Sequence, residues 1–91
     1  MTYTIVLTKK YKKRSRAFIR KHPELLSRYK TTILHLRSDP HHPSLRLHKL
    51  KGELSDFYSV SINMKYRILL DFIIRDDLII LIDIGSHQEL Y

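Results

Sequence analysis

The residues of this chain that could carry out chemistry lie in its last third, between Phe57 and Tyr91. Three strand-like runs follow one another there, and nearly every even-numbered position from Tyr58 to Ile84 is apolar. The polar residues fall on odd-numbered positions, namely Ser59, Ser61, Arg67, Asp71, Asp83 and His87. Side chains of a β-strand alternate between its two faces. The alternation therefore predicts one face that packs on the core and one face that carries the polar groups.

The register of the predicted hairpins decides which polar side chains meet. A three-residue connection at 63–65 would pair Val60 with Ile68 and Tyr58 with Leu70, which keeps apolar residues on one face. A second three-residue connection at 75–77 gives these expected pairs: Ile74 with Leu78, Phe72 with Ile80, Leu70 with Ile82 and Ile68 with Ile84. Both predictions assume strands without a β-bulge, which would shift the pairing.

This register places Ser61, Arg67 and Gly85 in one row on the polar face. His87 follows on the same side as Arg67, just beyond the end of the last strand. A guanidinium is a planar, permanently charged donor for phosphate oxygens, and an imidazole can give or take a proton near neutral pH. The pair therefore indicates a place where phosphate chemistry could occur.

Length and composition limit the class of protein. The 91 residues are enough for one domain, expected to span residues 1–91. The absence of cysteine excludes disulfides and thiolate metal sites, and it fits a reducing, cytoplasmic environment. The longest apolar run, residues 78–82, is too short to span a membrane, and the N-terminus lacks the pattern of a secretory signal.

Charge is concentrated in the N-terminal part of the chain. Residues 1–37 hold eleven Lys/Arg and one acid, a net of +10, whereas residues 38–91 hold six Lys/Arg and eight acids, a net of −2. Such a basic block favours a polyanionic partner such as RNA, or an acidic protein. The residues expected to contact RNA are Lys9, Lys10, Lys12, Lys13, Arg16 and Arg20. The alternative for each lysine taken singly is a solvated helix face.

The first half of the chain predicts a strand followed by two helices. Tyr3–Leu7 reads as a strand, and Thr8 is a suitable N-cap for a helix over Lys9–Lys21. A second helix is expected from Pro23 to Arg37, because proline suits a first helical position. The predicted core stripes of the two helices are Tyr11, Phe18 and Ile19, and Leu26, Tyr29, Ile33 and Leu36. Two helices joined by a tight break predict a helical hairpin laid on the sheet.

Residues 40–54 form a loop with several cationic side chains. Leu45, Leu47 and Leu50 are expected to dock this loop on the core, and Gly52 marks a turn. Ligand contacts tend to gather on such loops. The spacing of the histidines at 35, 41, 42 and 48 fits no zinc pattern, so no metal site is predicted.

The stretch SLRLHKLKGELSDFYSVSINMKYRILLDF, followed by IGSHQELY, resembles the RelE/ParE superfamily of bacterial type II toxin–antitoxin toxins. The nearest likeness is to the RelE, YafQ and HigB branches. Three motifs carry it: L-x-K-L-x-G before a strand, Y-R at the start of the next, and G-[ST]-H-x-x-[LV]-[YF] at the end. The resemblance implies an α+β fold, in which an N-terminal strand and a helical hairpin precede a three-stranded antiparallel meander, with the helices on one face of a twisted sheet.

The resemblance also implies a function. Members of this superfamily include small ribonucleases that cleave mRNA on the ribosome without a cofactor and are silenced by a cognate antitoxin. The toxin–antitoxin complex can bind operator DNA through the antitoxin. Two alternatives stay open: a ParE-like toxin that inhibits DNA gyrase, which the presence of both Arg67 and His87 disfavours, and a catalytically decayed module that binds an antitoxin or nucleic acid.

The family pattern assigns roles to three residues of this chain. By resemblance, Arg67 contacts the scissile phosphate, His87 is the near-terminal histidine of YafQ-like toxins, and Tyr91 stacks on a nucleobase. The chain departs from the pattern at Ser59 and Ser61, where RelE has two lysines. The second histidine and the Asp-Trp pair of YafQ are also missing, and Lys65 and Tyr66 stand there instead.

Metal-free cleavage of RNA needs a base for the 2′-hydroxyl, a charge stabiliser for the phosphorane-like transition state and an acid for the leaving 5′-oxygen. Arg67 suits the second role, and His87 suits the first or the third. The remaining role falls to the loop or to the ribosome, and the loop candidates for catalysis or substrate binding are His48, Lys49, Lys51 and Glu53. The alternative for Arg67 is an ordinary ion pair with Asp71 or Asp83, and the alternative for His87 and Tyr91 is a frayed terminus.

Overall fold

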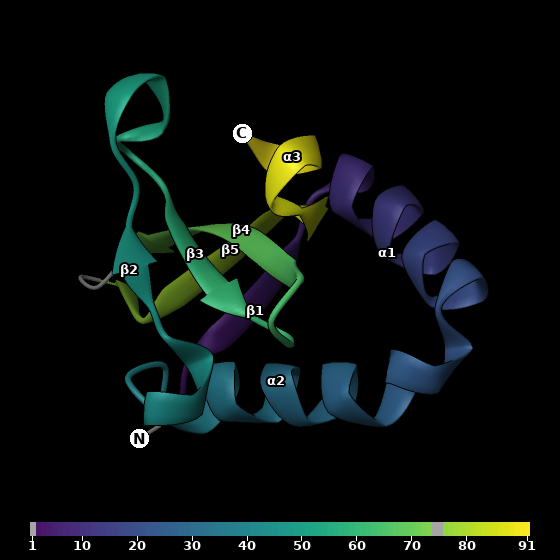
Figure 1. The fold of residues 1–91 in the computed structure, drawn as a ribbon. Coiled ribbons are helices and arrows are strands. Elements are labelled where there is room, and N and C mark those ends of the chain that lie inside the picture. Colours follow the sequence, from purple (N-terminus) through teal and green to yellow (C-terminus); the bar gives the residue numbers. More distant parts are fainter. Residues whose placement is uncertain (1, 74–75) are drawn as a thin grey trace.

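The computed structural model describes residues 2–73 and 76–91, and in them it has the α+β architecture that the sequence predicts. Five strands form one sheet in the order β1-β5-β4-β3-β2. Their bounds are Thr4–Leu7 (β1), His48–Lys49 (β2), Tyr58–Ser61 (β3), Tyr66–Ile73 (β4) and Leu78–Ser86 (β5). The strand β1 runs parallel to β5, and the other neighbours are antiparallel. Figure 1 shows the sheet with its helices.

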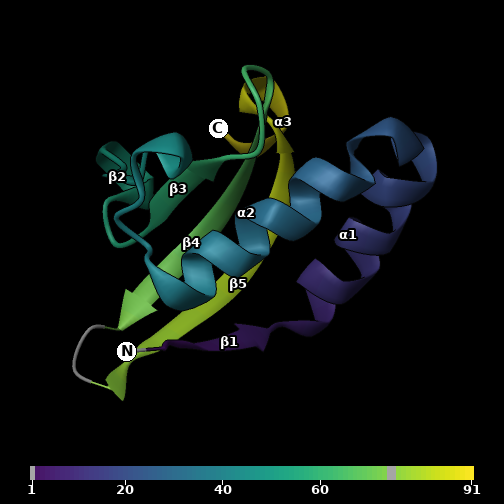
Figure 2. The same ribbon diagram turned by 90° about the horizontal axis from the view of Figure 1, so that it is seen from below.

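Two long helices contribute to the core on the sheet. The helix α1 spans Lys9–Lys21, and α2 spans Leu26–Ser38 after a 3-10 turn at Pro23–Leu25. The helix α2 crosses the sheet, while α1 lies beyond the end of β1 (Figure 2). Further 3-10 turns occur at Pro43–Leu45 and Gly52–Leu54, and a short helix α3, His87–Leu90, follows β5.

The helix α1 begins and ends where the sequence predicts. Thr8 caps it, since its Oγ1 accepts a hydrogen bond from the Tyr11 amide at 3.1 Å. Tyr11 and Phe18 are buried in the core, and Ile19 packs against it. The Tyr11 hydroxyl bonds to the Tyr29 hydroxyl of α2 at 2.8 Å, which ties the two helices together. Burial raises the pKa of Tyr11, so this phenol stays neutral.

The core stripe of α2 is predicted only in part. Leu36 is fully buried, and Tyr29 and Ile33 are partly buried against the core. Leu26 is 39% exposed, so its assignment to the core is wrong. Thr32 is buried instead, and its hydroxyl donates to the Arg28 carbonyl one turn earlier. A threonine can occupy that buried position because the helix itself satisfies its hydroxyl.

The first hairpin has the predicted register. Tyr58 pairs with Leu70 and Val60 with Ile68, and Ser61 lies opposite Arg67. The Ile62 amide donates to the Tyr66 carbonyl at 2.9 Å, which closes the connection at 63–65.

The second hairpin departs from the predicted register through a β-bulge. Ile68 pairs with Ile84 as expected, but the register shifts between Leu69 and Leu70. The predicted pairs Leu70–Ile82 and Phe72–Ile80 are wrong, because Leu70 pairs with Leu81 and Phe72 with Ile79. The prediction for Ile74 and Arg75 falls outside the described residues, although Leu78 pairs with Ile73.

Because of the bulge, the predicted burial of β5 is wrong between residues 79 and 82. Ile79 and Leu81 are fully buried in the core, while Ile80 and Ile82 are only half-buried, the reverse of the expected alternation. Ile84, beyond the bulge, is buried as predicted. An extra residue in one strand exchanges the faces of all residues on one side of it. No helix in the described part of the chain is long and apolar enough to cross a membrane.

Candidate active site

A cleft of about 420 Å³ opens where β2, β4 and α3 meet. Its lining combines residues from the loop, the sheet and the terminal helix: His48, Lys49, Leu50, Lys51, Leu54, Arg67, His87 and Tyr91. The fold therefore brings together all three residues that the family pattern singled out. It adds three of the four loop candidates. Glu53 is exposed and does not line the cleft.

Arg67 reaches the cleft from β4. Ser61 lies opposite it on β3 and Gly85 on β5, so the predicted row of three residues is present. The Arg67 Nη1 donates to Ser61 Oγ at 3.2 Å. Within residues 2–73 and 76–91, Arg67 forms no ion pair with Asp71, Asp83 or any other carboxylate, and Asp83 binds Lys10 and Arg14. Arg67 therefore keeps donor capacity for an anionic ligand.

Asp83 fixes α1 to the bulged part of β5. Its carboxylate accepts from Arg14 Nε at 2.8 Å, lies 3.2 Å from Lys10 Nζ and accepts from the Ile84 amide. Burial opposes its ionisation, but these hydrogen bonds outweigh burial and hold the pKa of Asp83 below its usual value. Asp83 is thus a structural anchor, although it was grouped with the polar face in the sequence.

His87 and Tyr91 are held by the short helix α3, which the sequence analysis missed. Ser86 Oγ accepts from the Glu89 amide, and Glu89 Oε1 accepts from the Ser86 amide at 3.0 Å, which is a capping box. The backbone and side-chain hydrogen bonds to Ser86 lower the pKa of Glu89. Glu89 also packs over Gly85, where an added Cβ would lie 3.2 Å from it. Serine followed three residues later by glutamate is a signal that could have predicted this helix.

The ring of His87, in α3, contacts the ring of Tyr91, the C-cap residue of this helix. The centroids of His87 and Tyr91 are 4.5 Å apart, and the rings meet edge to face at 83°. Both side chains are exposed, with Tyr91 at 41%. The ring of Tyr91 is therefore placed against the imidazole, and the alternative of a frayed terminus does not describe this structure.

His48 enters the cleft on the short strand β2, which the sequence analysis also missed. His48 pairs with Ser59 and Lys49 with Tyr58. The Nδ1 of His48 lies 3.0 Å from the Arg46 carbonyl oxygen. A carbonyl only accepts, so Nδ1 carries the proton and, in the neutral ring, Nε2 is the basic nitrogen.

The two serines that replace the family lysines differ in environment. Ser59 is fully buried, and its Oγ has no hydrogen-bond partner among the described residues. Ser61 is 8% exposed and accepts from Arg67. Neither serine lines the cleft, so neither supplies a cation or a base at its surface.

The basic residues of α1 lie apart from the cleft lining. All six predicted RNA contacts, Lys9, Lys10, Lys12, Lys13, Arg16 and Arg20, are exposed on this helix. Lys10 is 64% exposed while its ammonium is paired with Asp83. The helix therefore presents a cationic surface beside the sheet.

The histidines near the end of α2 are engaged within the protein. His35 and His42 stack with centroids 3.9 Å apart, and Ser44 Oγ contacts the Nδ1 of each, at 3.3 Å and 2.7 Å. His42 Nδ1 also accepts from the Ser44 amide. The described residues contain no group of three or more His, Cys, Asp or Glu that could hold a metal ion.

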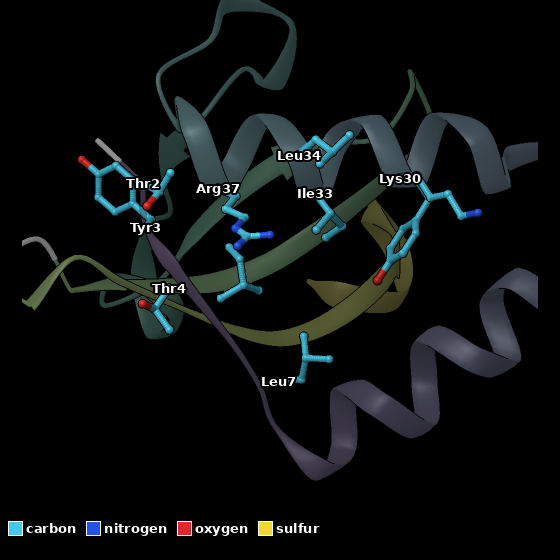
Figure 3. Close-up of a pocket in the computed structure, with 10 residues that line it drawn as sticks. Thr2, Tyr3, Thr4, Leu7, Lys30, Ile33, Leu34 and Arg37 are labelled. Carbon is cyan, nitrogen blue, oxygen red and sulfur yellow. The ribbon is translucent and has the colours of Figure 1, made fainter.

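A larger hollow of about 700 Å³, drawn in Figure 3, shares no lining residue with the cleft. It runs between β1 and α2, with Ile5, Leu7 and Ile33 among its apolar lining and Lys30 and Arg37 as its cations. It contains neither a histidine nor a carboxylate from the described residues. We therefore place the candidate active site in the smaller, polar cleft.

Comparison with known proteins identifies a family of bacterial toxins. The family model of YafQ, a bacterial toxin of type II toxin–antitoxin systems, matches residues 3–91. A copper-bound mutant toxin from Helicobacter pylori is 28% identical over 100% of both chains, with a TM-score of 0.74. No curated protein matches the chain.

Two more distant structures share the fold. The DinJ–YafQ toxin–antitoxin complex from E. coli is 15% identical, covers 100% of this chain and 99% of that chain, and has a TM-score of 0.78. A YoeB/ParE toxin from Agrobacterium tumefaciens is also 15% identical, covers 92% and 98%, and has a TM-score of 0.76.

Proposed function

The chain belongs to the YafQ family of bacterial toxins from type II toxin–antitoxin systems, and on that premise we propose that it is a ribosome-dependent mRNA endonuclease. One observation carries the proposal: Arg67, His87 and Tyr91 line one cleft together with His48. These groups offer a charge stabiliser, two imidazoles and a stacking ring. They suit cleavage of RNA by acid–base chemistry that needs no metal ion or other cofactor.

We assign the proton transfers to the two histidines. His48 Nε2 takes the proton of the 2′-hydroxyl, because its Nδ1 is bound to the Arg46 carbonyl. The 2′-oxygen then attacks the adjacent phosphorus, and Arg67 stabilises the charge that develops on the phosphoryl oxygens. The protonated His87 gives its proton to the leaving 5′-oxygen. The products are a 2′,3′-cyclic phosphate and a 5′-hydroxyl.

Tyr91 and the loop lysines hold the substrate. The exposed ring of Tyr91 stacks on a splayed base next to the scissile phosphate, as aromatic side chains do in other proteins that bind single-stranded RNA. Lys49 and Lys51 line the same cleft and bind neighbouring phosphates. Glu53 lies outside the cleft lining and receives no role.

Induction in bacterial cells tests this function. We expect growth arrest together with new cleavage sites in translated mRNA. Arrest with intact mRNA and with gyrase trapped on DNA would contradict the proposal and favour a ParE-like activity.

We further propose that the basic face of α1 binds ribosomal RNA by neutralising phosphates rather than by reading bases. Replacing Lys9, Lys12, Lys13 and Arg16 by glutamate should weaken ribosome binding and flatten its dependence on salt. Each lost phosphate contact should lower the salt slope by about one. Sedimentation with ribosomes at several salt concentrations measures both quantities. An unchanged affinity and slope would leave these residues as a solvated helix face.

A cognate antitoxin silences the protein in our proposal. YafQ from E. coli is found in a complex with DinJ, and RelBE2 from Mycobacterium tuberculosis is a toxin–antitoxin complex. We propose that the partner of this chain covers the cationic cleft or displaces α3, and that it links the complex to operator DNA. The exposed rings of His87 and Tyr91 motivate this site, as does Arg67, which has no carboxylate partner among the described residues.

Hydrogen exchange with and without the antitoxin tests this prediction. We expect changed protection in residues 57–91, because β4 contributes Arg67 to the cleft, and α3 with its C-cap residue contributes His87 and Tyr91. Changes confined to β1 and α2, around the apolar hollow of Figure 3, would mean that the antitoxin inhibits by another route.

A further inference from the structure

An arginine-lined hollow of about 390 Å³ lies at the C-terminal end of β3, near the candidate active site. It is formed by the end of the first hairpin, the 3-10 turn at Pro43–Leu45 and one side chain of α2. The residues that line it are Arg28, Pro43, Ser44, Arg46, Ser61, Ile62, Asn63 and Met64. None of the functions described above uses this hollow.

Its charge is purely cationic. Arg28 and Arg46 are both exposed, and no acidic residue lines the hollow in the described part of the chain. Neither arginine is ion-paired there with a carboxylate. Arg28 is oriented by its Nε, which donates to the Ile62 carbonyl at 3.0 Å. Two guanidinium groups without a protein counter-charge suit a phosphate, whose oxygens accept bidentate hydrogen bonds.

Two hydrogen bonds connect this hollow to the catalytic cleft. Ser61 lines the hollow, and its Oγ accepts from Arg67, which lines the cleft. Arg46 lines the hollow, and its carbonyl oxygen accepts from His48, which lines the cleft. The two depressions are therefore linked through Arg67, the proposed charge stabiliser, and His48, the proposed base.

Arg46 holds an unfavourable backbone conformation. Its φ of 50° lies in the left-handed region, where glycine is preferred and most other residues are strained. Strained residues of this kind gather at functional sites. An arginine at this position destabilises the loop relative to glycine, which is consistent with a function for its side chain.

We propose that Arg28 and Arg46 form a second phosphate subsite, which binds the RNA phosphodiester next to the scissile one. The proposal rests on the proposed nuclease function and deepens it. The substrate strand passes from Arg67 over Ser61 into the arginine-lined hollow. Met64, which is 83% exposed on the hairpin, provides an apolar surface for the base of that nucleotide.

Binding of uncleavable RNA tests the subsite. The probe is uniformly 2′-O-methylated RNA, which lacks the attacking hydroxyl, as an oligonucleotide of about 8 nucleotides and as a dinucleotide with one phosphodiester. Arg46→Gly and Arg28→Lys should weaken binding of the longer probe, by about tenfold for Arg46→Gly, and leave dinucleotide binding unchanged. Arg46→Gly should also raise the Tm, because it relieves the left-handed strain. Loss of affinity with a gain in stability separates a ligand role from a structural one.

Arg37→Gln is the matched control, because it removes one exposed arginine of α2 that lines the apolar hollow instead. It should leave the affinity for both probes unchanged. Equal affinity of wild type and Arg46→Gly for the longer probe would overturn the subsite, as would wild-type binding that does not depend on probe length. The subsite would likewise be overturned if the two variants bound the antitoxin more weakly but bound RNA as the wild type does. That result would assign the arginines to the antitoxin interface. Cleavage by the wild type is scored separately, so failure of the nuclease function is distinguishable from failure of the subsite.

Discussion

Replacing His87 by alanine should lower the rate of mRNA cleavage by a factor on the order of 10²–10⁴, the usual contribution of a general acid or base. The reason is that His87 lines the cleft with Arg67 and can protonate the leaving 5′-oxygen. The fold should be unaffected, because His87 is exposed and the capping box of α3 uses Ser86 and Glu89. Single-turnover cleavage on programmed ribosomes measures the rate.

The pH dependence of the rate separates chemistry from binding. The mechanism needs a deprotonated base and a protonated acid, so the wild-type rate should pass through a maximum as the pH rises, and the fall on the alkaline side should disappear in His87→Ala. His41→Ala is the matched control, because His41 is exposed but does not line the cleft. An unchanged rate and pH profile for His87→Ala would mean that another group gives the proton.

Arg67→Ala should cost a factor on the order of 10²–10³ in the same rate, the range found when one donor to a developing oxyanion is removed. Arg67 has no carboxylate partner in the described residues, so its charge is available to the phosphate. Lysine at this position should restore only part of the rate, because an ammonium lacks the planar pair of donors. Thermal unfolding should change little, since the hydrogen bond lost is a single partly buried one to Ser61.

The double variant Arg67→Ala/His87→Ala tests whether the two residues act on the same phosphate. Groups that act as a unit give losses that do not multiply. We therefore expect the double variant to be less impaired than the product of the two single losses. Fully multiplicative losses would indicate separate steps, and Arg37→Ala serves as the control for removal of a surface arginine.

Sequence patterns predicted the row of Ser61, Arg67 and Gly85 correctly, because the observed strand register at these residues equals the predicted one. The first hairpin keeps strict alternation, so counting from the 63–65 connection gives the correct pairs. The second hairpin pairs Ile73 with Leu78, one residue away from the prediction, and the bulge at Leu69/Leu70 then restores the predicted register. Two deviations thus cancel before the strands reach Arg67.

The bulge itself depends on contacts that are distant in sequence. It lies where β1 ends and α1 takes its place beside β5. Thr8 donates there to the Leu81 carbonyl at 2.9 Å, and Arg14 binds Asp83 and the Ile84 carbonyl. Alternation in one strand carries no information about such partners. The apolar run of β5 therefore gave no sign of which residues are buried.

The positions of the catalytic candidates were predictable to different degrees. Arg67 follows from strand register, whereas the placement of His87 and Tyr91 depends on the cap between Ser86 and Glu89. His48 joins the cleft only because a two-residue strand pairs with β3, and such short pairing has no periodic signal in the sequence. The choice of Nε2 as its basic nitrogen requires the contact with the Arg46 carbonyl, which only the structure provides.

The chemical ends of the cleaved RNA test the central claim most directly. The purified protein is added to ribosomes translating a defined mRNA, and the fragments on both sides of the cut are analysed. Attack by the 2′-oxygen, with proton transfers by histidines and charge stabilisation by Arg67, predicts a 2′,3′-cyclic phosphate on the upstream fragment and a 5′-hydroxyl on the downstream one. Intact mRNA, or fragments with a 3′-hydroxyl and a 5′-phosphate, would contradict the account.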